Sequence, residues 1–167
     1  MLFRSLGSKQ ISSLSTDKVA ALSTAQIQAI QNSVISSITS DQLAAMDTGQ
    51  LKALTANQVK SMTSDQIINL SAEGLRALDA SDIAAIGVST IKAISSKVID
   101  LSLDQISALT TSQAQALTIA QLSKLSVEQV SSLSYADVAV MTSDQVMSLN
   151  TDQLAGLSTT QIQAISS

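Results

Sequence analysis

The chain has 167 residues, a formal net charge of −4 and 45% hydrophobic residues, so it is long enough to bury a core as one domain. It contains no cysteine, histidine or proline, which excludes disulfides and metal sites built from cysteine or histidine. Its nine basic residues are scattered singly, a distribution that argues against nucleic-acid binding. No apolar run approaches the roughly 20 residues of a transmembrane helix, and no secretory signal is visible at the N-terminus.

An eight-residue unit, Leu-[Ser/Thr]-x-x-Gln-[Ile/Val/Leu]-x-[Ala/Ser], repeats from Leu6 to the C-terminus. Residues 1–5 form a short lead-in. Twelve octads cover 6–100, the last of them one residue short, and eight octads plus a partial one cover 101–167. A fixed short period indicates stacked copies of one small element. We therefore expect two solenoid blocks, 6–100 and 101–167, in one continuous domain.

Each octad, with its positions numbered 1 to 8, has the pattern of a capped short helix. A continuous helix would rotate its apolar stripe by about 80° per octad, and a strand would point the two large apolar positions to opposite faces. Position 2 is Ser or Thr in fourteen of twenty octads, and position 5 is Gln in thirteen. These residues have the spacing of a capping box, while apolar positions 1 and 6 form a hydrophobic staple.

The candidate capping residues come in pairs three residues apart. A Ser or Thr oxygen is expected to accept from a backbone N–H of the first turn, and the Gln side chain to reach back to the cap residue's own N–H. The pairs are Ser23 with Gln26, Thr39 with Gln42, Thr63 with Gln66, and Ser158 with Gln161.

A single octad buries too little surface to be stable, so the octads must stack with positions 1 and 6 inward and positions 3, 4 and 7 outward. Two octads per coil would give a flat solenoid and three a triangular one. The recurrence of acidic residues at position 4 favours three. The predicted fold is thus an all-α solenoid of very short capped helices, one per octad, with about three and possibly two octads per coil.

Two stretches depart from the repeat. The octad at 30–37 carries Gln31 at its cap position and Val34 where Gln is usual, and residues 86–100 lose both Gln residues and one residue of length. Either these stretches bend the array or offer a docking site, or they are drift in a tolerant repeat.

The sequence offers no chemistry of catalysis. A nucleophile needs a neighbouring base, and histidine is absent. No phosphate-binding or calcium-binding motif occurs. We therefore predict a protein that is not an enzyme and has no catalytic, cofactor or metal site. The evenly spaced hydroxyls suggest ice binding as a minor alternative, but capping already accounts for them.

Octads such as Leu22–Ala29 (LSTAQIQA), Met141–Ser148 (MTSDQVMS) and Leu149–Gly156 (LNTDQLAG) resemble the octapeptide arrays of large bacterial secreted and surface proteins of the adhesin type. The resemblance covers nearly the whole chain. It implies an extracellular or cell-surface location and a structural role, and it supplies no catalytic residues.

The leading functional hypothesis is a non-enzymatic structural protein that forms an extended rod and associates head to tail with itself. Its C-terminal end is an ordinary octad without the polar cap that monomeric solenoids carry, and a head-to-tail contact gives fibres. The candidate contact residues are Leu2, Phe3 and Leu6 at one end and Ile162 and Ile165 at the other. The alternative is a spacer, adhesin stalk or binding module within a larger secreted protein, with neighbouring domains as its partners.

Overall fold

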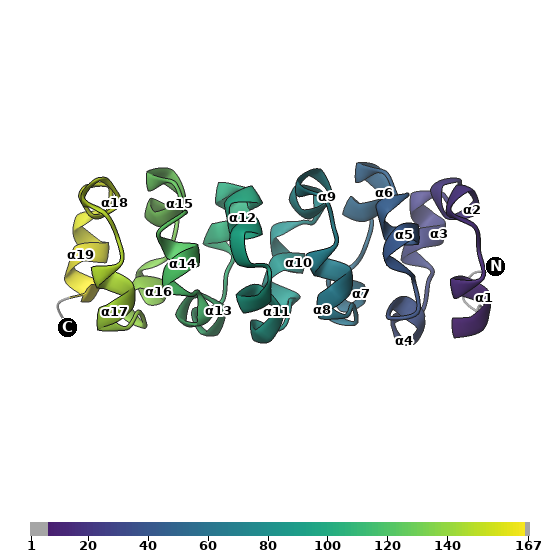
Figure 1. The fold of residues 1–167 in the computed structure, drawn as a ribbon, viewed down its shortest axis with the longest axis horizontal. Helices are drawn as coiled ribbons and strands as arrows, with labels where there is room; N and C mark the ends of the chain where they lie inside the picture. Colours follow the sequence, from purple (N-terminus) through teal and green to yellow (C-terminus); the bar gives the residue numbers. More distant parts are fainter. Residues whose placement is uncertain (1–6, 166–167) are drawn as a thin grey trace. The chain divides into compact units, whose positions relative to one another are not determined.

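The computed structural model describes residues 7–165, and every regular element in that range is a helix (Figure 1). The all-α prediction is therefore confirmed. The chain divides into two compact units, Met1–Ile86 (unit 1) and Gly87–Ser167 (unit 2). The two units meet between Ile86 and Gly87, whereas the predicted solenoid blocks meet between residues 100 and 101. The short octad at 94–100 therefore lies within unit 2.

In the described part of unit 1, residues 7–86, there are ten helices of four to six residues, one in each octad. They are α1 (Ser8–Ser12), α2 (Thr16–Ala20), α3 (Thr24–Gln28), α4 (Asn32–Ile35), α5 (Ser40–Ala44), α6 (Thr48–Lys52), α7 (Ala56–Lys60), α8 (Ser64–Ile68), α9 (Ala72–Ala77) and α10 (Ala80–Ala85).

Unit 2 continues the pattern with one 3₁₀ helix among its α-helices. Its elements are α11 (Val88–Ala93), η2 (Ser95–Asp100), α12 (Leu103–Ser107), α13 (Thr111–Ala116), α14 (Ile119–Leu122), α15 (Val127–Ser131), α16 (Tyr135–Ala139), α17 (Ser143–Met147), α18 (Thr151–Ala155) and α19 (Thr159–Ile165).

The end of α5 shows how one octad passes to the next. Ala45 keeps a helical conformation, and its N–H bonds to the carbonyl of Asp41. The N–H of Met46 then bonds to the carbonyl of Leu43 at 3.1 Å, which closes the last turn. Asp47 is extended, with φ −76° and ψ 170°, and caps α6. The N-cap residues of α1 to α18 are all extended in this way, so the chain turns by one corner at the start of each of these helices.

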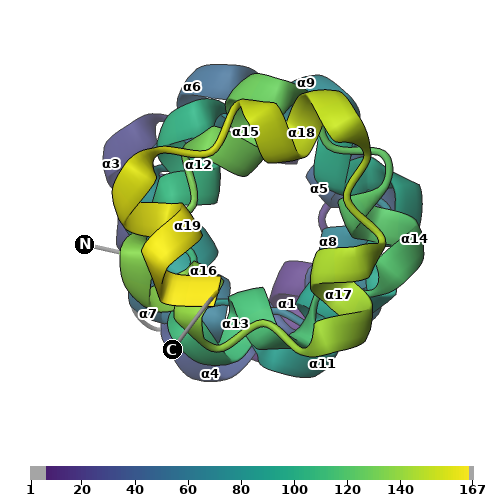
Figure 2. The same cartoon turned by 90° about the vertical axis from the view of Figure 1, so that its left-hand side faces the viewer.

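Helices three elements apart pack against each other within each unit. In unit 1, α1 contacts α4, α2 contacts α5 and α7 contacts α10, and in unit 2, α12 contacts α15 and α16 contacts α19. Figure 2 shows α17, α18 and α19 following one another around the axis of unit 2. This spacing confirms a coil of about three octads and does not support the two-octad form.

The core consists of positions 6 and 1 of the octads. In the middle of unit 1, Ile67 and Leu70 are each 2% exposed, and in unit 2, Ile106 and Val130 are fully buried. Position 7 points outward, as the exposed Lys52 and Lys60 show. From Val34 to Gln161 position 5 is also buried: Gln58 is only 1% exposed although its side chain is polar. Its burial requires that all of its polar groups find partners.

The two irregular stretches have distinct local structures. α4 is four residues long, and the side chain of its N-cap residue Gln31 makes no capping bond. In unit 2, the short octad forms the 3₁₀ helix η2, which begins at Ser95 with φ 49°. A non-glycine residue in this left-handed region is unfavourable, so the missing residue of this octad is accommodated at some conformational cost.

Candidate functional site

The predicted capping pairs lie together at the starts of their helices. Ser23 Oγ accepts from the N–H of Gln26 at 3.3 Å, and Gln26 Oε1 accepts from the N–H of Ser23 at 2.8 Å. The same reciprocal bonds join three further pairs, namely Thr39 with Gln42, Thr63 with Gln66, and Ser158 with Gln161. Each pair satisfies two of the N–H groups that the first turn of a helix leaves without a partner.

The glutamine side chains also bond to the preceding coil, a role that the sequence reasoning missed. Gln58 Nε2 donates to the carbonyls of Ile27 at 2.8 Å and Ile30 at 2.9 Å. Its Oε1 at the same time accepts from the N–H of Thr55 at 2.9 Å. One buried carboxamide therefore caps its own helix and ties two coils together.

These inter-coil bonds recur along both units, and we call the residues that make them the glutamine ladder. It comprises Gln42, Gln50, Gln58 and Gln66 in unit 1 and Gln121, Gln129, Gln145, Gln153 and Gln161 in unit 2. Their acceptors lie 28 to 31 residues earlier in the sequence. Since three octads are 24 residues and four are 32, one coil takes between three and four octads.

A signal for this role was present in the sequence. Glu caps helices as well as Gln does in a capping box, yet position 5 is never Glu in the twenty octads. A carboxylate can only accept hydrogen bonds, whereas a carboxamide both accepts and donates. The use of Gln in thirteen octads and of Glu in none indicates that a donor is favoured in addition to the cap.

Two aspartates replace glutamine in buried parts of this pattern. Asp82 is 2% exposed and accepts from the N–H of Asp79 at 2.9 Å. Burial raises the pKa of the Asp82 carboxyl above its ordinary value, although the bond from the Asp79 N–H opposes this shift. Asp137 is 1% exposed and accepts from the N–H and the hydroxyl of Ser134. Both residues keep the capping bond but supply no amide donor.

The end of unit 2 exposes the apolar positions that are buried elsewhere. Position 6 is at most 2% exposed from Ile106 to Val138. Val146 and Leu154 are half-buried, and Ile162 is 43% exposed. We call the apolar surface made by Met141, Val146, Leu154, Ile162 and Ile165 the C-terminal face.

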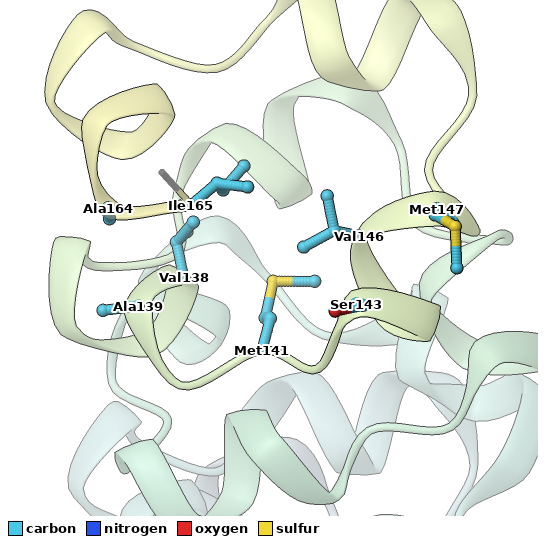
Figure 3. A pocket seen from close by; sticks show the side chains of 8 residues that line it. All are labelled: Val138, Ala139, Met141, Ser143, Val146, Met147, Ala164 and Ile165. Atoms are coloured by element: carbon cyan, nitrogen blue, oxygen red, sulfur yellow. The ribbon is translucent and has the colours of Figure 1, made fainter. Parts of the chain in front are cut away.

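A pocket of about 360 Å³ opens on this face between α16, α17 and α19. In Figure 3, the side chains of Val138, Met141, Val146 and Ile165 point toward a common space, while Met147 points away from it. Seven of the eight lining residues have apolar side chains, and the eighth is Ser143. The lining side chains therefore include no acid, base or amide of the kind that converges in a catalytic site.

Two of the five predicted self-association residues lie within the described residues. Ile162 and Ile165 lie on the C-terminal face, whereas Leu2, Phe3 and Leu6 fall outside the described residues. Within residues 7–165, no group of three or more acidic, histidine or cysteine side chains has the arrangement of a metal site. Over the same range, none of the short helices has the length and hydrophobicity to cross a bilayer.

Comparison with protein families gives one result. The model of the ALTTAQ repeat matches residues 3–32, 35–72 and 130–167, which together are more than half of the chain. A near-copy of these six letters stands at Ala21–Gln26 (ALSTAQ), across the junction of two octads. Among curated proteins, none matches the chain.

Proposed function

The chain belongs to the ALTTAQ repeat family, and from that membership and its C-terminal face we propose that it is a non-enzymatic structural protein that associates end to end. Repeated association would build a rod or fibre from copies of the chain, because a head-to-tail contact does not close on itself. We further propose an extracellular or cell-surface location, which rests on the resemblance of the octads to secreted arrays.

One observation carries the proposal. Val130 at position 6 is fully buried, whereas the equivalent Ile162 near the end of unit 2 is 43% exposed. Solenoids that stay monomeric usually cover such an end with polar capping residues. Contact with the first coil of another copy would bury Ile162 as Val130 is buried, and the associated gain is about 25 cal/mol per Å² of apolar surface.

The test is concentration-dependent assembly, followed by light scattering and electron microscopy. The variant Ile162→Lys with Ile165→Lys places two ammonium groups on the C-terminal face, where burial without a partner costs several kcal/mol. A matched control, Thr160→Lys with Gln163→Lys, adds the same charge to exposed positions of α19. We expect the wild type and the control to assemble and the first variant to remain monomeric.

Two results would count against the proposal. If the wild type stays monomeric at all accessible concentrations, the spacer or stalk of a larger secreted protein becomes the better function. If both lysine variants assemble like the wild type, association uses some surface other than the C-terminal face.

A further inference from the structure

The first coil of unit 1 presents hydrogen-bond donors without acceptors among the described residues. Gln10 Oε1 accepts from the N–H of Gly7 and Gln26 Oε1 from the N–H of Ser23, both at 2.8 Å, as in the glutamine ladder. Their Nε2 groups have no acceptor within residues 7–165, and Gln10 is exposed. Lys18 occupies position 5 of the octad between them and is likewise exposed. The first coil thus carries two amide donors and one ammonium donor at position 5, the position that the glutamine ladder occupies in later octads.

The last coil of unit 2 presents the matching acceptors. Inside unit 2, the carbonyls of Leu122 and Leu125 are acceptors of the glutamine ladder, since Gln153 Nε2 donates to them at 2.9 and 2.8 Å. The corresponding carbonyls one coil later belong to Val146 with Leu149 and to Leu154 with Leu157. Among residues 7–165 none of these four carbonyls receives a side-chain donor, because Gln161, the last member of the ladder, bonds to Ser131 and Leu133.

From this match we propose that the partner on the C-terminal face is the first coil of a second copy, held by the same bonds that form the glutamine ladder. This inference rests on the proposed end-to-end function and adds the residues that determine its register and polarity. Donors lie on one end and acceptors on the other, so the contact joins unlike ends. Two like ends would set donor against donor or carbonyl against carbonyl.

The register follows from the residue that already occupies the next place in the array. Ile165 is position 1 of the octad after Leu157–Ala164, and it lines the pocket with Val138 and Met141. The first octad of a second copy would therefore follow the octad that Ile165 begins. There Gln10 Nε2 donates to the carbonyls of Val146 and Leu149, and Lys18 Nζ donates to those of Leu154 and Leu157. A lysine at this second site also stands beside the C-terminal end of α18, where a positive charge is favourable.

The experiment removes the two donors that this register uses, those of Gln10 and Lys18, and keeps the fold of the first coil. In the variant Gln10→Glu with Lys18→Met, the new carboxylate still accepts from the N–H of Gly7, but both donors are lost. The control, Gln28→Glu with Lys9→Met, makes the same changes of residue type and charge at exposed positions of α3 and α1. Sedimentation velocity and light scattering measure the concentration at which half of each protein is assembled.

We expect the donor variant to need at least about tenfold more protein for half assembly than the wild type, since unpaired polar groups at a contact are costly. The control should match the wild type. Lys18→Gln, which restores a ladder residue, should assemble at least as well as the wild type. If the wild type and donor variant assemble equally, the proposed register is wrong while end-to-end association stands. If the wild type does not assemble, both the register and the proposed function are wrong.

Discussion

The carboxamide of Gln58 donates to the carbonyl of Ile27, 31 residues earlier, at 2.8 Å, and both residues are almost wholly buried. The bond crosses from one coil to the next. The Ile27 side chain is itself part of the apolar core. Hydrophobic burial and the hydrogen bond that aligns the two coils are therefore found at the same residue. Apolar contacts alone tolerate sliding, whereas a carboxamide with three partners fixes one coil on another.

The first prediction concerns this bond. Gln58→Leu removes the donor to Ile27 and Ile30 and leaves the N–H of Thr55 without its acceptor. Buried polar groups that lose their partners cost about 1–3 kcal/mol, so we expect unfolding free energy to fall by roughly 2–3 kcal/mol. Urea denaturation followed by circular dichroism measures this change.

The control for that prediction is Gln28→Leu, at an exposed position of α3. It should change the unfolding free energy by no more than about 0.5 kcal/mol. An equal loss in the two variants would mean that the inter-coil bonds contribute no stability of their own.

Much of the fold could be predicted from the sequence because its determinants are local. The phase of Ser or Thr against Gln and the two apolar positions specifies where each helix begins, as at Thr39 and Gln42. The length of a coil could not be derived in the same way. It depends on bonds such as that from Gln42 to Leu14, 28 residues apart, which no local pattern encodes.

The site was predictable to a smaller extent. Exposure of Ile162 followed from the position of its octad in the array, whereas the donor role of the glutamines was overlooked because capping explained them already. The residues Leu2, Phe3 and Leu6 stay a prediction, since they lie outside the described residues.

The second prediction concerns the core. Ile67→Ala and Leu70→Ala each remove a side chain that is 2% exposed, and each should cost about 2–5 kcal/mol through lost burial and the cavity left behind. Lys60→Ala, at an exposed position of α7, should stay within about 0.5 kcal/mol. Thermal unfolding of the three variants measures the difference, and equal effects would show that inward and outward positions are wrongly assigned.

The third prediction concerns pH and Asp82. Burial raises the pKa of this carboxyl, so the folded state holds its proton at pH values where the unfolded state has lost it. The stability that this proton confers is fully present below the unfolded pKa of about 3.8 and is lost as pH rises through the higher folded pKa.

Asp82→Asn removes this titration and keeps an oxygen that can accept from the N–H of Asp79. Relative to the wild type, the variant should therefore gain stability as pH rises from about 4 toward neutrality. Urea midpoints across that range measure the difference. Asp65→Asn, at an exposed position of α8, serves as the comparison. A wild type and an Asp82→Asn variant with parallel pH profiles would contradict the raised pKa.

The last prediction concerns a close approach between two helices of unit 2. A methyl group added at Gly156, the residue after α18, would overlap Val127 Cγ1 and lie 3.1 Å from Ser131 Oγ. The hydroxyl of Ser131 also donates to the Gly156 carbonyl at 2.8 Å, so the two segments cannot easily separate. Gly156→Ala should therefore cost about 1–3 kcal/mol through overpacking. Val127→Ala removes the nearer obstacle, and the double variant Gly156→Ala with Val127→Ala should be more stable than the sum of the two single changes allows. A double-mutant cycle of urea denaturation measures this coupling, and strictly additive effects would show that Val127 is not what requires glycine at position 156.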